Sequence, residues 1–292
     1  PIFLIIKFKT GKAEGKIKGT LFICATPIGN LEAVSFRLIR TLKEVGLIAA
    51  EDTRTIRKLL RKYNILKKDI VSYHDFSKEG RINYIIGKLE AGENIALVSE
   101  SGTPSIQDPG FEIVNECIKR NITVTTVPGP NAAISALVLS GLPADNFLFI
   151  GFLPKAGGKR KNKLSELATF PYTLIFYESP NRIEALTGEL IERFGDRRAG
   201  LVREITKIYE EVIRGSLSDI LTRIKEKKVK GEIVLVVEGY KKELIGSFSE
   251  EDIRKELIRL LKQGISKKSA LKIVLSRYDI DKQRLYNIAT KI

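Results

Sequence analysis

Long apolar runs, cysteine and histidine are scarce in this 292-residue chain, and each scarcity excludes a class of protein. The nearest candidate for a membrane span, Ile2–Ile6, stops at Lys7, far short of the roughly 18 apolar residues that a span requires. It is also too short for a signal-peptide core and has no small-residue cleavage site after it. Two cysteines, Cys24 and Cys117, and a single histidine, His74, provide neither a disulfide scaffold nor a zinc site. We therefore expect a reduced, cytoplasmic protein without a membrane span or a bound metal.

Positive charge, in contrast, is abundant. Fifty Lys and Arg residues against thirty-five Asp and Glu give a net charge of +15. Such a surplus favours a polyanionic partner, most commonly nucleic acid, although on charge alone a compositional bias explains it equally well.

The distribution of the charge favours nucleic acid. Residues 53–68 contain seven positive residues and no acid, with one basic helical face. Residues 155–163 contain five positive residues around two glycines, which predicts a flexible basic loop. Residues 240–292 contain thirteen basic and seven acidic residues. The predicted RNA contacts are Arg54, Arg57, Lys58, Arg61, Lys155, Lys159, Arg160, Lys161, Arg182, Lys267 and Lys268.

The pattern of apolar runs predicts about two α/β domains, the first at 19–141 and the second at 142–239. Strands of the first are predicted at 20–25, 47–50, 70–73, 95–99 and 122–127. Its helices are predicted at 35–45, from Asp52 or Thr53 through the basic face, from Ser77 to about Gly92, and at 130–139. This alternation predicts a mostly parallel sheet with helices on both faces.

The second unit has predicted strands at 147–151, 173–177, 199–203, 208–213 and 232–238, and predicted helices at 161–167, 180–193 and 216–226. The short join between the units predicts a cleft between them. Residues 240–292 form a basic helical C-terminal domain, with helices at 249–262, 266–276 and 281–290, and residues 1–18 form an extension. The predicted core of the tail is Ile265, Ala270, Ile273, Val274, Leu285, Tyr286 and Ile288. The tail is either a helix-turn-helix-like RNA element or a packing cap.

Loops of unusual composition follow several predicted strands. They are Thr26–Asn30, Glu51–Arg54, Ser99–Pro104 with Asp108–Gly110, Pro128–Ala132 and Tyr177–Arg182. Ligands bind at the carboxyl ends of parallel strands, and Gly and Pro let a rigid backbone approach them closely. The chain has no GxGxxG after a strand, no P-loop and no GxSxG elbow, so these loops belong to another kind of site.

The motifs TPIGNL, LIAAEDTR, ALVSESGTPSIQDPG, VPGPNAAISAL, GFLPK, FYESPNR and GEIVLVVEG occur in an order that resembles the ribosomal RNA small subunit methyltransferase I family, within the tetrapyrrole methylase superfamily. The resemblance extends from about Gly19 to Gly239. It implies two α/β domains with S-adenosyl-L-methionine in the cleft between them. It also implies 2′-O-methylation of a cytidine in small-subunit (16S) ribosomal RNA, either free or in the assembled subunit, by a homodimer.

The resemblance also implies the cofactor-binding residues. These are Pro27, Gly29, Ser101, Gly102, Thr103, Pro104, Gly129, Pro130, Ala132, Tyr177 and Glu178. The chain departs from the family pattern at Glu100–Ser101, where members often have Asp-Ala, and at Phe76 and Asn181, where many have histidine.

A ribose hydroxyl is a poor nucleophile, so an acid or base near it is expected. The candidates are Glu51 and Glu100, which otherwise cap helices, and His74, which otherwise is a surface residue. Two alternative functions stay open. One is a small-molecule tetrapyrrole or diphthine-type methylase, which does not need the basic surfaces. The other is a non-enzymatic RNA-binding assembly factor, which does not need intact Gly/Pro loops.

Overall fold

A computed structural model describes residues 17–74, 79–241, 248–262, 265–278, 280–290 and 292. The chain forms two compact units, one ending at Glu238 and the other comprising Gly239–Ile292. Most of the predicted N-terminal extension, together with Phe76 and the predicted helix start at Ser77, lies outside the described residues. No helix within the described ranges has both the length and the apolar character needed to cross a membrane.

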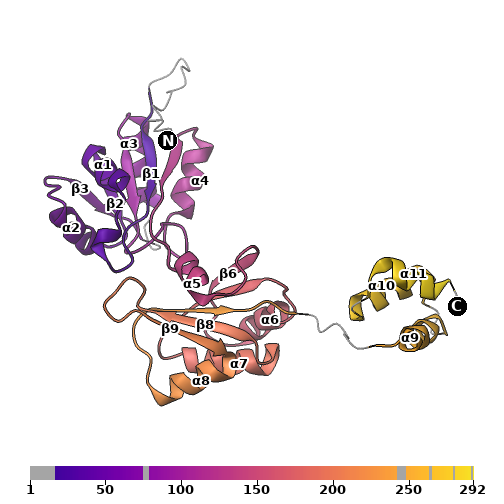
Figure 1. Cartoon of the computed structure of the whole chain (residues 1–292). Helices are drawn as coiled ribbons and strands as arrows, with labels where there is room; N and C mark the ends of the chain where they lie inside the picture. Colours follow the sequence, from indigo (N-terminus) through magenta and orange to yellow (C-terminus); the bar gives the residue numbers. More distant parts are fainter. Residues whose placement is uncertain (1–16, 75–78, 242–247, 263–264, 279, 291) are drawn as a thin grey trace, which may run out of the picture. The chain divides into compact units, whose positions relative to one another are not determined.

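Five short parallel strands form the first sheet, in the order β3-β2-β4-β1-β5 (Figure 1). They are β1 (Thr20–Cys24), β2 (Leu47–Ala50), β3 (Asp69–Ser72), β4 (Ile95–Val98) and β5 (Thr123–Val127). Every residue of β2 and β4 is buried, as expected for central strands of a sheet covered on both faces.

Helices cover both faces of this sheet (Figure 1). On one face lie α1 (Phe36–Glu44) and α2 (Thr53–Lys62), packed on alternate strand residues such as Cys24 and Ile48. On the other lie α3 (Glu79–Glu90) and α4 (Phe111–Lys119), packed on Leu21 and Leu47. The predicted α/β fold with helices on both faces is confirmed, although α4 was not predicted.

The second sheet is mixed, in the order β6-β7-β10-β8-β9. Its strands are β6 (Phe147–Phe152), β7 (Thr173–Glu178), β8 (Arg198–Arg203), β9 (Glu211–Ser216) and β10 (Ile233–Val237). Only β6 and β7 are parallel; β10 runs antiparallel to both neighbours, and β8 to β9. The predicted strand at 208–213 in fact begins at Glu211. One face is covered by α6 (Gly158–Leu167), α7 (Ile183–Phe194) and α8 (Leu217–Glu226).

Helix α5 (Ala132–Ser140) connects the two α/β domains. It follows β5 of the first sheet but packs on the other face of the second, against Ile175, Val202 and Val236 (Figure 1). The approach is close, because a Cβ on Gly200 would lie 2.8 Å from the Cβ of Ser140. The N-terminus of α5 is therefore fixed at the junction of the two domains.

The prediction of a flexible basic loop at 155–163 is wrong, because most of this segment belongs to α6. Arg160 explains this: it is buried, and its Nε lies 2.9 Å from Glu189 Oε2 on α7. Its Nη1 also donates to the carbonyl of Pro154 at 3.1 Å. This paired guanidinium fixes α6 to α7, so Arg160 has a structural role rather than the predicted RNA contact.

The C-terminal unit contains α9 (Glu250–Lys262), α10 (Lys267–Arg277) and α11 (Lys282–Ala289), and each contacts the other two. Of the predicted core, Ala270, Val274, Leu285 and Ile288 are buried and Ile265 and Ile273 pack against them. Tyr286 is 46% exposed, so its predicted place in that core is wrong. The unit has its own apolar core, which also includes Ile253, Leu257 and Leu260 of α9.

Both cysteines are buried and free. Burial raises the pKa of Cys24 to about 12 and that of Cys117 to about 11. Neither thiol therefore forms a reactive thiolate at neutral pH, and both serve as small apolar core residues.

Candidate functional site

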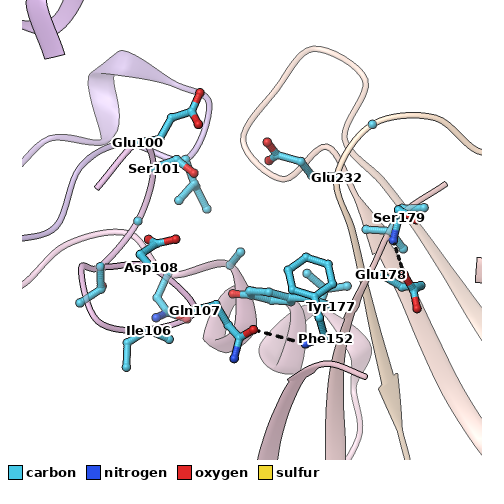
Figure 2. A pocket seen from close by; sticks show the side chains of 18 of the residues that line it. Glu100, Ser101, Ile106, Gln107, Asp108, Phe152, Tyr177, Glu178, Ser179 and Glu232 are labelled. Atoms are coloured by element: carbon cyan, nitrogen blue, oxygen red, sulfur yellow. Dashed lines mark hydrogen bonds between the residues drawn. The ribbon is translucent and has the colours of Figure 1, made fainter. Parts of the chain in front are cut away.

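A cavity of about 470 Å³ lies between the two α/β domains, within the size range of ligand pockets. Figure 2 shows Glu100, Ser101 and Asp108 on one side of it and Tyr177, Phe152 and Glu232 on the other. The first wall consists of the loop after β4, the start of α5 and Ile28 of the loop after β1. The second consists of the ends of β6 and β7 and the start of β10.

The β4 loop (Ser99–Gly110) has an unusual backbone. Gly102 has a φ of +81°, and Ser105 and Gln107 adopt positive φ values of 72° and 65° without being glycine. Two hydrogen bonds between Thr26 and Gly102, of 2.8 and 3.1 Å, hold the loop to the end of β1. Such strained conformations persist only where surrounding contacts fix them, and they concentrate at functional sites.

The structure places about half of the predicted cofactor-binding residues in the cavity lining. Those that line it are Ser101, Gly102, Thr103, Ala132, Tyr177 and Glu178, whereas Pro27, Gly29, Pro104, Gly129 and Pro130 are not in the lining. Some of the latter support the walls. Gly129 allows its loop to approach Ala25, whose Cβ would lie 3.0 Å from an added Cβ.

Tyr177 presents an aromatic face to the cavity. Its ring makes edge contacts with Phe149 and Phe152, with centroids 5.0 and 5.7 Å away. Burial raises the pKa of the Tyr177 hydroxyl, which keeps it neutral. The ring is thus a fixed apolar surface on which a planar group can pack.

Glu178 contributes to the lining, but its carboxylate serves the fold. Its Oε1 accepts from the N–H of Ser179 at 2.8 Å and pairs with Arg182 Nη2 at 2.6 Å. The side chain is fully buried. Arg182, predicted to bind RNA, is therefore committed in part to this pair at the start of α7.

Besides the paired Glu178, three further carboxylates line the cavity, namely Glu100, Asp108 and Glu232 (Figure 2). They come from both walls, in a chain whose net charge is strongly positive. Glu51 lies just behind them, because its Oε2 accepts from the N–H of Glu100 at 3.1 Å. Glu51 therefore supports the loop that presents Glu100, but it does not line the cavity.

Two other predicted residues lie away from the lining. His74 follows β3, at the edge of the first sheet, and is exposed. Arg54, on α2, pairs with the N-cap residue Asp52 at 2.8 Å and has a side chain that is 87% exposed. Hydrogen bonds from Arg54 lower the pKa of Asp52 to about 2.

The remaining predicted RNA contacts are exposed. On α2, Ile56, Leu59 and Leu60 face the core, which leaves the basic residues outside. The exposed basic residues in question are Arg57, Lys58, Arg61, Lys155, Lys159, Lys161, Lys267 and Lys268.

Sequence reasoning missed part of each wall. The missed lining residues are Ile28, Ile106, Gln107, Asp108, Phe152, Ser179, Pro180 and Gly231–Val234. For several of these the sequence contains a signal, because Asp108–Gly110 and GEIVLVVEG are recognisable motifs, although the motifs alone assign no role to each residue. Phe152, at the carboxyl end of β6, was identifiable from the rule that ligands bind at strand ends.

A parallel α/β layer and a mixed one, with a cavity between them, define a class of methylases. Residues 20–221 match the family of Tetrapyrrole (Corrin/Porphyrin) Methylases, and the chain belongs to that family. The fold is shared with uroporphyrin-III C-methyltransferase from Thermus thermophilus, solved in complex with S-adenosylhomocysteine. That structure has a TM-score of 0.52 and 20% identity, over 75% of this chain and 97% of the other.

Within this class, the chain belongs to the ribosomal RNA small subunit methyltransferase I family, as the motifs predicted. It is 43% identical to the protein of that name from Halalkalibacterium halodurans, over 93% of this chain and 94% of the relative. It is 42% identical to the one from Synechocystis sp., over 94% and 98% respectively.

The cavity fits S-adenosylmethionine in its chemistry. The cofactor combines a carboxylate, a sulfonium cation and a planar adenine. First-turn N–H groups of α5, beside Asn131 and Ala132, are suited to a carboxylate. The carboxylates of the lining suit the cation, and the aromatic surface at Tyr177 suits a planar base.

Proposed function

We propose that this chain transfers a methyl group from S-adenosyl-L-methionine to the 2′-oxygen of a cytidine ribose in small-subunit (16S) ribosomal RNA. One observation carries the proposal: a cavity lined by four carboxylates, three of them in addition to the paired Glu178, lies between the domains of a chain with a strongly positive net charge. The acidic lining suits a cationic cofactor, and the basic exterior suits a polyanionic substrate. Relatives at 43% and 42% identity that are named as ribosomal RNA methyltransferases support the same substrate class.

When bound, the cofactor supplies a methyl group made electrophilic by the sulfonium. The protein needs to hold the hydroxyl close to it and in line, and to exclude water. Ser101, Gly102 and Thr103 hold the first side of the cavity, and Tyr177 closes the second. Glu100, Asp108 and Glu232 stabilise positive charge in the cavity.

We assign the hydrogen bond from the ribose hydroxyl to Glu100. It is the only one of the three proposed catalytic residues that lines the cavity, whereas Glu51 positions its backbone. A carboxylate that accepts this hydrogen bond would orient the oxygen lone pair and receive the hydroxyl proton as the oxygen–methyl bond forms. The methyl–sulfur bond would break in the same step, and the cofactor would leave as a neutral thioether. His74 is not needed for this step.

We place the proposed RNA contacts on each unit separately: on the basic residues of α2 and α6 in the first unit, and on those of α10 in the C-terminal unit. Arg54 lies in the first turn of α2, and Lys267 and Lys268 in that of α10. Positive charge at a helix N-terminus is unfavourable to the helix, because it opposes the macrodipole. On α2 the ion pair of Arg54 with the N-cap residue Asp52 offsets this cost, whereas the exposed Lys267 and Lys268 at the start of α10 favour an anionic ligand.

Arg57→Ala and Lys161→Ala should each weaken RNA binding about evenly across sequences. Each should also reduce the slope of log affinity against log salt by about one unit. Both side chains are exposed and remote from the cavity lining, so cofactor affinity should be unchanged.

The measurement is RNA binding by fluorescence anisotropy at several salt concentrations. The exposed Lys225 on α8 provides a control, as Lys225→Ala. Slopes equal to wild type for both variants would show that these charges do not contact phosphate.

We further propose a cytoplasmic homodimer. Large apolar side chains such as Phe36 and Ile208, which are 97% and 95% exposed, are candidates for coverage by a second copy. Light scattering coupled to size-exclusion chromatography measures the mass directly, and a monomer at micromolar concentration would contradict this proposal.

Transfer of labelled methyl from S-adenosylmethionine tests the function. The acceptors are small ribosomal subunits, free 16S RNA, a tetrapyrrole precursor and a protein substrate of the diphthine type. We expect incorporation into the subunit or its RNA alone. Incorporation into the tetrapyrrole or the protein would establish the alternative methylases. Cofactor binding by calorimetry separates an enzyme from a non-enzymatic assembly factor, which would show none.

A further inference from the structure

The segment between β8 and β9, Glu204–Glu210, connects the two walls of the cavity. Glu204 and Thr206 have positive φ values, 51° and 68°, although neither is glycine. Ile205 between them is buried in the same apolar cluster as Ile28, a lining residue of the first wall. Strained backbone with a buried anchor indicates that this segment is held in one conformation by its surroundings.

On the side of the second wall, Lys207 and Glu204 hold the start of β10. Lys207 Nζ lies 2.9 Å from Glu204 Oε1 and 3.3 Å from Glu232 Oε2. Glu204 Oε1 also accepts from the N–H of Glu232 at 3.0 Å, and Glu204 N–H donates to the carbonyl of Glu232 at 3.0 Å. A Cβ on Gly231 would lie 2.2 Å from Glu204 Oε1, so only glycine allows this contact. Gly231 and Glu232 both line the cavity.

On the side of the first wall, the same segment packs against the loop after β1. Thr206 Oγ1 accepts from the N–H of Asn30 at 3.1 Å. A Cβ on Gly29 would lie 2.6 Å from Lys207 Cγ and 2.9 Å from Thr206 Oγ1. Gly29 is therefore needed where the aliphatic part of Lys207 crosses it, which gives this glycine a role other than direct contact with a ligand.

We propose that Lys207 is a positioning residue that sets the separation of the two cavity walls. Its aliphatic chain packs on Gly29, next to the lining residue Ile28 of the first wall, and its ammonium group holds Glu204 and Glu232 at the second. A ligand that contacts both walls then binds a preorganised site, without the cost of bringing the domains together. The identity of this ligand rests on the proposed function, in which S-adenosylmethionine occupies the cavity.

Lys207 is not suited to act as a base. Although burial favours the neutral amine, hydrogen bonding to Glu204 and the nearby Glu232 charge prevail and raise the pKa of Lys207. Its effect on methyl transfer must therefore come through the position of the walls. Removal of a proton acceptor changes the shape of the pH profile of methyl transfer, whereas removal of a positioning residue does not. Removal of Lys207 should therefore leave the shape of this profile unchanged.

The test is S-adenosylmethionine binding to full-length chains by calorimetry. Lys207→Met keeps the aliphatic length and removes the charge, and it should weaken binding about tenfold, the size expected for one lost charge-assisted hydrogen bond. Lys207→Arg should recover most of the affinity. The control is Lys225→Met, on an exposed helix face away from the cavity. Thr206→Val keeps the shape and backbone strain, removes only the bond to Asn30, and should weaken binding about threefold.

The outcomes separate this proposal from the proposed function. If wild type does not bind S-adenosylmethionine, the proposed function is wrong. If wild type binds and both Lys207→Met and Thr206→Val bind equally well, the positioning role is wrong. Hydrogen exchange provides a second measurement: the amide of Asn30 should exchange faster in both variants than in wild type. Unchanged exchange in folded variants would also overturn the proposal.

Discussion

Replacement of Gly102 by valine should weaken S-adenosylmethionine binding at least about tenfold in a chain that remains folded. Gly102 has a φ of +81°, a region that β-branched residues avoid at a cost of about 1–3 kcal/mol. Space is not the cause, because the nearest atom to an added Cβ is Ile28 Cγ2 at 3.5 Å. The loop should relieve the strain by leaving its pairing with Thr26, which moves Ser101 and Thr103 in the cavity wall.

Gly195 provides a matched control for this variant. It has a φ of +78° at the end of α7, has no atoms within 4 Å of an added Cβ, and is not in the cavity lining. Gly195→Val should therefore lose a similar amount of thermal stability and keep wild-type affinity. The affinity for S-adenosylmethionine is measured by calorimetry on folded protein. If Gly102→Val and wild type have equal affinities, the β4 loop is not part of the cofactor site.

A chain that ends at Gly239 should bind S-adenosylmethionine normally but methylate ribosomal RNA poorly. The first compact unit ends at Glu238 and includes the whole cavity lining. The tail has its own core and a net charge of +6 from thirteen basic and seven acidic residues. Because loss of several phosphate contacts lowers RNA affinity steeply, we expect a decrease of about 10- to 100-fold in methylation at limiting RNA.

Charge reversal in the full chain distinguishes an RNA contact from a packing role of the tail. The Lys267→Glu and Lys268→Glu double variant should reproduce the RNA defect, since both side chains are exposed in the first turn of α10. Acidic residues there also favour the helix dipole, so stability should not fall. Normal methylation by the truncated chain would show that the tail is not an RNA-binding element, and loss of cofactor binding would make it part of the core.

The first sheet was largely predictable, because its strands are short apolar runs separated by recognisable caps. Ser35 and Asp52 cap α1 and α2 as the sequence indicated. Helix α4 was missed because its signals are weak: Gly110 provides no side-chain cap, and exposed Phe111 and Ile118 blur the apolar stripe of Ile113 and Cys117.

The second wall of the cavity was predictable only in part. The rule that ligands bind at carboxyl ends of parallel strands identified Tyr177 at the end of β7. It could not identify Gly231 and Glu232, which immediately precede β10. Because β10 is antiparallel to β7, Ile233 pairs with Glu178 and the start of one strand lies beside the end of the other. Strand direction in a mixed sheet depends on tertiary packing, which local sequence does not specify.

Charge patterns predicted exposure well on α2 but not at Arg160. A run of lysines and arginines around two glycines reads as a solvated loop, yet one guanidinium in the run pairs with Glu189, twenty-nine residues away. A long-range ion pair leaves no local periodicity. The same holds for Lys207, whose contacts with Gly29 and Glu232 are separated widely in sequence.

The most direct test of the account is to identify the methylated nucleoside. Small ribosomal subunits are incubated with the protein and S-adenosylmethionine, the RNA is digested to nucleosides, and the product is analysed by mass spectrometry. The account predicts one new 2′-O-methylcytidine. This nucleoside should be absent when the Glu100→Gln variant is used at an S-adenosylmethionine concentration that gives it the same cofactor occupancy as wild type. A base-methylated nucleoside, or a methyl group on another ribose, would contradict it.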